Sequence, residues 1–166
     1  MEIKLTHHFP CTPQAYWDAT RHPDFEPIAR ERAEIDYTRL DAREEGARAY
    51  TRARVSPRKE LPALVQKAIG QARLSYVQEL EEDSATLTTR WKVIPDFLTE
   101  KVQCSGGSRV VPAAGGCDRI IEGTIDVSIP FIGGTIEKQI VEQISRSYDK
   151  AAEVLRTFIQ DKAVST

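Results

Sequence analysis

Several features that mark large classes of proteins are missing from this sequence of 166 residues. No apolar run approaches the roughly 18 residues of a membrane-spanning helix, and the first ten residues, MEIKLTHHFP, lack the basic start and apolar centre of a secretory signal. The 23 basic and 25 acidic residues nearly balance, so the net charge of -2 gives no field that would attract nucleic acid. We therefore expect a cytoplasmic protein with no nucleic acid among its partners.

Cysteine and histidine are too scarce and too scattered to build a metal site. Cys11, Cys104 and Cys117 have no CxxC spacing, which argues against a zinc knot and against a redox pair. The GxSxG, HExxH and P-loop motifs are missing as well. We expect reduced structural thiols, no metal, no cofactor and no catalytic residue, and these absences favour a protein that is not an enzyme.

One histidine keeps a catalytic alternative open. His7 shares its strand parity with Ile3 and Leu5, so its side chain is expected to face the interior, where it would be placed to act as a general base. The more frequent role for a lone histidine on an apolar face is that of a hydrogen-bonded core residue, and we favour it.

Hydrophobic periodicity divides the chain into seven strands, three short helical pieces and one long terminal helix. The predicted strands are 2–9, 33–40, 47–55, 71–80, 84–94, 99–111 and 116–129. The short helical pieces, which follow the first and third strands, are 12–20, 24–32 and 61–70.

The terminal helix is predicted over about residues 135–161, roughly 40 Å at 1.5 Å per residue. Its apolar residues recur at spacings of three or four and form one stripe: Ile136, Ile140, Ile144, Tyr148, Ala151, Leu155 and Phe158. A stripe of this length needs an equally long partner, and within one domain only the inner face of a curved antiparallel sheet offers it. The prediction is an α+β domain spanning 1–166, in which a seven-stranded antiparallel sheet wraps around the helix.

The arginines of the third predicted strand, ARAYTRARV, have two interpretations. A turn centred near Glu44 would place Asp36 opposite Arg52 and Glu34 opposite Arg54, so that the second strand neutralises the third. The alternative is a phosphate-binding face. We favour the neutralised, solvated face.

At this point the sequence resembles the START-like superfamily, also called the birch-pollen-allergen-like or SRPBCC superfamily. FPCTPQAYWDA is similar to its opening strand-to-helix passage, and IEGTIDVSIPFIGGTIEKQI to its last strand and helix start. The segments LPALVQKAIG and PAAGGC most resemble an uncharacterised bacterial branch. The resemblance implies the helix-grip fold and a cavity between sheet and helix that takes sterols, phospholipids, polyketides or other apolar molecules.

The expected inner face of the sheet carries many small side chains, which predicts an accessible cavity in preference to a filled core. The opposing alternative is that these small residues let the helix approach closely. The residues predicted to contact an apolar ligand come from the inner face and from the helix: Tyr37, Ala49, Thr51, Ala53, Tyr76, Gln78, Leu87, Thr89, Trp91, Cys104, Gly123, Ile125, Ile140, Ile144 and Tyr148.

The third, fifth and seventh predicted strands run in one direction, so the segments that follow them emerge at one end of the molecule. These segments carry apolar residues that a solvated loop does not need, namely Leu64, Phe97, Leu98, Phe131 and Ile132, followed by Gly133 and Gly134. They predict a ligand entrance that makes transient membrane contact; a plug over the helix terminus is the alternative.

The sequence thus favours binding, and transfer between membranes, of a lipid or another hydrophobic small molecule. The alternatives are an enzyme of the polyketide cyclase or hydratase type and a regulatory module that binds a protein partner, both of which the resemblance also implies.

Overall fold

A computed structural model describes residues 1–97 and 99–164 of the chain. Its elements follow one another as β1 (Glu2–Phe9), α1 (Pro13–Thr20), α2 (Phe25–Ala33), β2 (Ile35–Glu45), β3 (Arg48–Pro57), α3 (Ala63–Ile69), β4 (Tyr76–Asp83), β5 (Thr88–Pro95), β6 (Val102–Ala113), β7 (Gly116–Val127) and α4 (Gly133–Val164). The predicted order of strands and helices, including short helices after the first and third strands, is confirmed.

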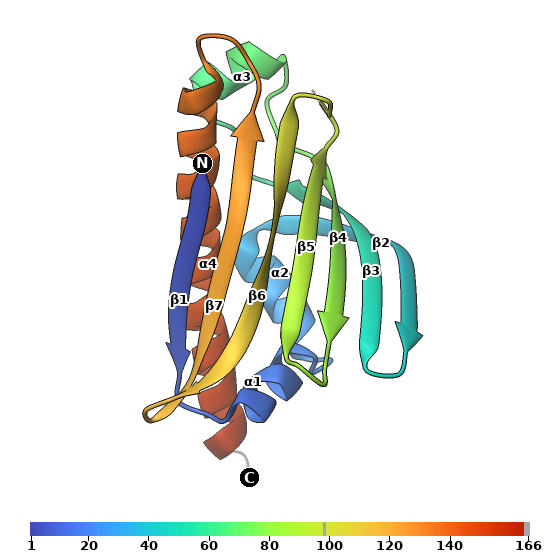
Figure 1. The fold of residues 1–166 in the computed structure, drawn as a ribbon, viewed down its shortest axis with the longest axis vertical. Coiled ribbons are helices and arrows are strands. Elements are labelled where there is room, and N and C mark those ends of the chain that lie inside the picture. Colours follow the sequence, from blue (N-terminus) through green and yellow to red (C-terminus); the bar gives the residue numbers. More distant parts are fainter. Residues whose placement is uncertain (98, 165–166) are drawn as a thin grey trace.

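The seven strands form one antiparallel sheet in the order β1-β7-β6-β5-β4-β3-β2. Helix α4 lies along β1 and β7 and is flanked by α1 and α2, so the helices cover the concave face of the sheet (Figure 1). We call the end of the sheet that carries α3 the upper end, and the end that carries α1 the lower end (Figure 1). This architecture confirms the predicted helix-grip fold.

Helix α4 extends over 32 residues, about 48 Å at the α-helical rise, and so exceeds the predicted length by a few residues. Its apolar stripe faces the sheet, but the burial changes along it. Ile136 and Leu155 are buried, whereas Ile140, Ile144 and Tyr148 in the middle are only half-buried. The middle of the helix is therefore less tightly covered than its ends.

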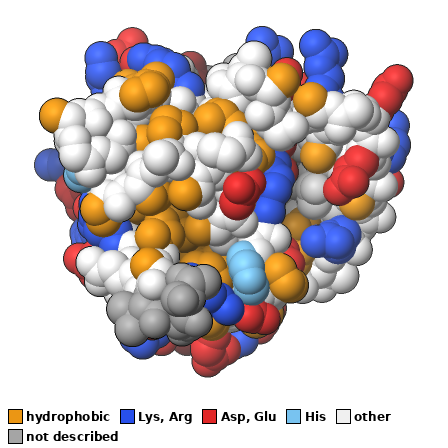
Figure 2. All heavy atoms as spheres, turned by 90° about the horizontal axis from the view of Figure 1, so that it is seen from below, with side chains coloured by type: hydrophobic (Ala, Val, Ile, Leu, Met, Phe, Trp, Pro, Cys, Tyr) orange, Lys and Arg blue, Asp and Glu red, His pale blue; other side chains and the backbone are white. Residues whose placement is uncertain are grey.

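Two separate hydrophobic clusters hold the helix to the sheet. The upper cluster contains Ile3, Trp91, Cys104, Ile125, Val127 and Ile136. The lower cluster contains Phe9, Tyr16, Phe25, Val110, Cys117, Ala152, Leu155 and Phe158. Seen from the lower end, hydrophobic side chains gather near the middle of the face (Figure 2).

Two hairpin registers differ from the predicted ones. In β2 and β3 the turn lies at Gly46, where φ is +58°, and Leu40 forms a bulge between Arg39 and Asp41. In β6 and β7, a turn at residues 112–115 would set Gly106 opposite Ile121, but the observed pairing is displaced by two residues and sets Gly106 opposite Gly123. A displacement of two residues keeps each side chain on its predicted face, because the side-chain period of a strand is two.

The arginines of β3 are neutralised, but not by the predicted partners. Arg52 pairs with Glu79 of β4 at 3.5 Å, and Arg54 pairs with Asp96. Asp36 instead pairs with Arg58, and Glu34 caps α2 in the left-handed conformation. The arginines are therefore neutralised by acidic residues of β4 and of the segment after β5. The predicted partners on β2 are out of reach because the turn at Gly46 shifts β2 along β3.

Candidate functional site

Several predicted ligand-binding residues gather on the concave face opposite the middle of α4. Across β4 and β5, Leu80 lies opposite Trp91 and Gln78 opposite Val93. The side chains of Tyr76, Gln78, Leu80, Thr89 and Val93 are only half-buried although they point toward the helices. The concave face is therefore open to solvent in part, beside a buried Trp91.

Three predicted site residues from different elements approach one another. The phenol of Tyr76 on β4 lies within electrostatic range of Tyr148 on α4 and of Cys104 on β6. Burial, with these neighbours adding to it, raises the pKa of Tyr76 to about 12. Burial likewise raises the pKa of Tyr148 to about 12 and that of Cys104 to about 11. All three groups therefore stay protonated at neutral pH and act as neutral polar contacts.

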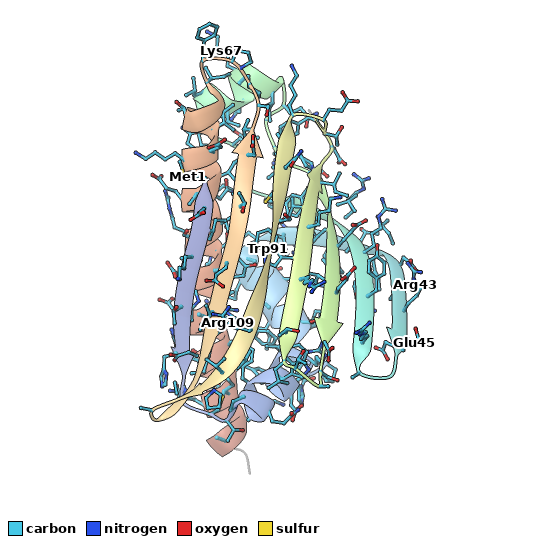
Figure 3. All side chains as sticks on the ribbon, in the orientation of Figure 1. Met1, Arg43, Glu45, Lys67, Trp91 and Arg109 are labelled. Carbon is cyan, nitrogen blue, oxygen red and sulfur yellow. The ribbon has the colours of Figure 1, made fainter. Side chains whose placement is uncertain are left out.

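Trp91 occupies the space that the inner-face glycines leave, near the centre of the sheet (Figure 3). A Cβ atom on Gly123 would lie 2.7 Å from two carbons of its indole ring, and one on Gly106 would lie 2.5 Å from the same ring. The two glycines accommodate the Trp91 ring, so the space beside them does not contribute to the predicted cavity. The indole nitrogen itself is buried and has no hydrogen-bond partner among the described residues.

Five further residues of the predicted ligand-binding set take three kinds of position. Ala49, Thr51 and Ala53 lie on β3 opposite Glu82, Leu80 and Gln78 of β4. Leu87, predicted within a strand, instead lies in the turn before β5 with a φ of +52° and packs on the lower cluster. Tyr37 lies on the edge strand β2, where Arg30 of α2 covers its ring at 3.7 Å.

A layer of polar side chains separates the two hydrophobic clusters. His7 of β1 is 7 % exposed and pairs in register with Arg119 of β7. Arg119 Nη2 lies 3.2 Å from His7 Nδ1 and 3.5 Å from the carbonyl oxygen of Tyr148, and its Nη1 lies 3.3 Å from the Tyr16 hydroxyl. On the other side of the imidazole, His7 Nε2 lies 2.7 Å from Asp149 Oδ1.

The contacts of His7 determine where its proton lies. A guanidinium group only donates hydrogen bonds, so His7 Nδ1 accepts from Arg119. The ring proton is then on Nε2, which donates to the carboxylate of Asp149. Both ring nitrogens are engaged, which leaves His7 no free lone pair to remove a proton from a ligand. The geometry favours the hydrogen-bonded core role over the general base.

Arg119, Tyr16 and Asp149 were not predicted as site residues. Arg119 was detectable, because it shares the inward parity of β7 with Cys117, Ile121 and Ile125 and is the one charged residue among them. An inward-facing charge between buried apolar positions is unusual and points to a functional or structural polar contact. Tyr16 and Asp149 could not be identified in this way, because each lies on a helix that carries both polar and apolar residues, where neither residue type is unusual.

The predicted entrance residues that the structure describes lie at the upper end. Phe131 in the connection from β7 to α4 is fully exposed, with a relative accessibility of 106 %, and Leu64 of α3 is 46 % exposed. Phe97 and Ile132 are half-buried, and Leu98 lies outside the described residues. Two shallow depressions flank this end, one lined by Val127, Pro130, Phe131 and Gly134, the other by α3 and the residues after it. Neither is enclosed between sheet and α4, so both the accessible cavity and the entrance stay predictions.

The described residues contain neither a metal-binding cluster nor a membrane-spanning helix. No group of three or more His, Cys, Asp or Glu side chains within residues 1–97 and 99–164 is arranged to hold a metal ion. None of the helices in the same ranges has both the length and the hydropathy that a bilayer crossing requires.

Comparisons with known proteins agree on the fold. The model of a family described as "Protein of unknown function (DUF2505)" matches residues 4–159. No curated protein matches the sequence. Solved structures include TTHA0849 from Thermus thermophilus, with a TM-score of 0.67, 18% identity and complete coverage of both chains. Ara h 8.0201 has a TM-score of 0.67 and 14% identity, covering 97% of this chain and 98% of its own. The Zhui aromatase/cyclase from Streptomyces sp. R1128 has a TM-score of 0.62 and 9% identity, and the match covers 98% of this chain and 94% of the cyclase chain.

Proposed function

The chain belongs to the DUF2505 family and has the helix-grip fold of the START-like superfamily, and from this premise we propose that it binds a hydrophobic small molecule between the sheet and α4. The proposal extends to transfer of that molecule, a lipid or similar compound, between membranes. It treats the protein as a binding module with no catalytic step of its own.

The observation that carries the proposal is the incomplete burial of the inner face. Apolar side chains of the sheet and of α4 that point toward each other are only half-buried around the upper cluster: Leu5, Leu80, Val93, Val102, Ile140 and Ile144. When a further apolar group covers such partly accessible surfaces, the complex is stabilised by about 25 cal/mol for each Å² of apolar surface removed from water. A hydrophobic ligand with few polar groups suits such a surface.

An enzyme of the cyclase type is the second candidate, and the polar layer is the observation that favours it. A His7–Asp149 pair beside Arg119 places three ionisable groups next to an apolar interior. One similar structure is an aromatase/cyclase, and another is the di-domain ARO/CYC StfQ from the steffimycin biosynthetic pathway. The engaged ring nitrogens of His7 weigh against acid–base catalysis, so binding is the better supported function.

The exposed Phe131 supports a role of the upper end in ligand transfer. A fully exposed aromatic ring on a connecting segment costs free energy in water and is favoured at a membrane surface. We propose that Phe131, with Phe97, Ile132 and Leu64 around it, contacts the membrane while the ligand passes.

Transfer kinetics test this role. Phe131→Asp and Phe97→Asp should each slow the transfer of a fluorescent fatty acid between phosphatidylcholine vesicles several-fold, because a carboxylate resists insertion among lipid headgroups and acyl chains. The amount of fatty acid bound at equilibrium should change little. Leu40→Asp is the matched control, since Leu40 is 48% exposed but lies on the edge strand β2. Transfer rates that equal the wild-type rate in both phenylalanine variants would remove the membrane role.

A further inference from the structure

Arg119 stands at the boundary between the two hydrophobic clusters. Its β1 neighbour His7 lies between Leu5, which packs on the upper cluster, and Phe9 of the lower cluster. The facing helix changes cluster at the same level, between Ile144 and Ala152. Arg119 therefore lies between the half-buried residues around the upper cluster and the well-packed lower cluster.

The guanidinium group of Arg119 has no counter-ion among the described residues. Its partners are neutral: the imidazole of His7, the hydroxyl of Tyr16 and the carbonyl oxygen of Tyr148. Its Nε atom is buried and makes no hydrogen bond in the described part of the chain. Asp149 does not pair with the positive charge of Arg119, because its carboxylate bonds to His7 Nε2 on the opposite side of the imidazole ring.

A half-buried charge with an unused donor is costly, since transfer out of water is repaid only when the charge is paired and hydrogen-bonded. Such a donor is satisfied by an ordered water or by a ligand that brings an acceptor. The group is also held in a fixed orientation, because the rings of Phe9 and Tyr148 lie 5.6 Å and 5.3 Å from its central carbon. A rigid, planar guanidinium with a free N–H matches the geometry of a carboxylate.

We propose that Arg119 binds the oxyanion end of an amphiphilic ligand, whose apolar tail extends toward the upper end along the half-buried side chains around the upper cluster. This rests on the proposed function and names the ligand class: a long-chain carboxylate. Along β7 the upper region extends from Arg119 to Val127, about 26 Å at strand rise, which suits a long tail and not a small acid. The ligand enters with its charged end first and leaves its tail toward Phe131.

The competing role for Arg119 is purely structural. Its bonds to Tyr16 and Tyr148 tie β7 to α1 and α4, and a variant that lost them would be less stable whether or not a ligand binds. Ligand charge separates the two roles, because a structural tie has no preference between a carboxylate and an uncharged head of similar size.

Calorimetric titration with oleate and with oleyl alcohol provides the test. Wild-type protein should bind oleate at least tenfold more tightly than oleyl alcohol. Arg119→Met, which keeps most of the side-chain volume, should reduce oleate affinity to the level of the alcohol and leave alcohol affinity within about twofold. Arg109→Met is the matched control, because Arg109 is exposed on the outer face of β6 and pairs with Glu122 at 2.7 Å (Figure 3); it should retain the preference for oleate.

Each outcome bears on one claim. Wild-type protein that prefers neither oleate nor oleoyl lysophosphatidate to the alcohol, or an unchanged preference in folded Arg119→Met, would overturn the role of Arg119 while keeping apolar binding. If Arg119→Met does not fold, Arg119→Lys decides: it keeps the charge but not the planar fork, and should lose part of the preference, whereas an unaltered preference overturns the proposal. A preference for oleoyl lysophosphatidate that depends on Arg119, without one for oleate, would support oxyanion recognition and assign it to a phosphate. Binding of none of these ligands would instead contradict the proposed function itself.

Discussion

Replacing Gly123 by alanine should lower the free energy of unfolding by about 2–3 kcal/mol, a large effect for one added methyl group. The new Cβ atom would lie 2.7 Å from two carbons of the Trp91 indole and 2.9 Å from the backbone oxygen of Ser105. The ring is 6% exposed, so it has no free space into which it can turn, and the strand pairing with β6 holds the oxygen. Chemical denaturation monitored by circular dichroism measures the loss.

A double-mutant cycle shows whether the indole is the cause. Trp91→Phe removes the two ring carbons nearest to Gly123, so the cost of Gly123→Ala should be smaller in that background, with a coupling energy of about 1 kcal/mol. The Ser105 oxygen keeps part of the cost in place. Wild-type stability in Gly123→Ala would mean that unfilled space exists at the centre of the sheet, as small inner-face residues first suggested.

Gly133→Ala should be nearly as damaging, and its neighbour provides the control. A Cβ atom on Gly133 would lie 2.2 Å from the backbone oxygen of Val127, so the connection from β7 to α4 would have to open. That connection is held closed by a hydrogen bond of 2.9 Å from Gly133 N to Ile129 O. We expect a loss of about 2–3 kcal/mol, measured by the same denaturation.

Gly134 has open space in the same first turn of α4. An added Cβ atom there meets nothing within 4 Å, so Gly134→Ala should be neutral or should stabilise the helix by about 0.5–1 kcal/mol. A similar loss in both alanine variants would show that backbone freedom of the pair, and not the close approach at Gly133, is what the connection requires.

Sequence patterns predicted the fold well because they depend on local geometry. Alternation places a residue on one face of a strand whatever its partner is, and the apolar stripe of α4 required one long concave surface. Register depends instead on the turns. The two-residue displacement of β6 against β7 altered the predicted partners and kept every side chain on its face, whereas the one-residue bulge at Leu40 reverses the alternation of β2 beyond it.

The displacement of β6 against β7 explains why the sequence did not show that Gly106 and Gly123 together accommodate a large side chain. The predicted register set Gly106 opposite Ile121, whereas the observed register sets Gly106 opposite Gly123 and beside Trp91 of β5. Two glycines paired across the strands create a site for one large ring, and composition alone cannot distinguish such a site from an empty one. The inward-facing Arg119 was within reach of the same parity argument, but its neutral surroundings arise from four elements that meet only in the folded chain.

Native mass spectrometry tests most directly whether one hydrophobic molecule binds between the sheet and α4. Protein purified from its own host, or incubated with oleate, should carry one small-molecule mass per chain that is released on denaturation. The released compound should be an amphiphile with an acidic end. Protein that carries no added mass from its host, and that gains none after incubation with either oleate or oleyl alcohol, would contradict the account.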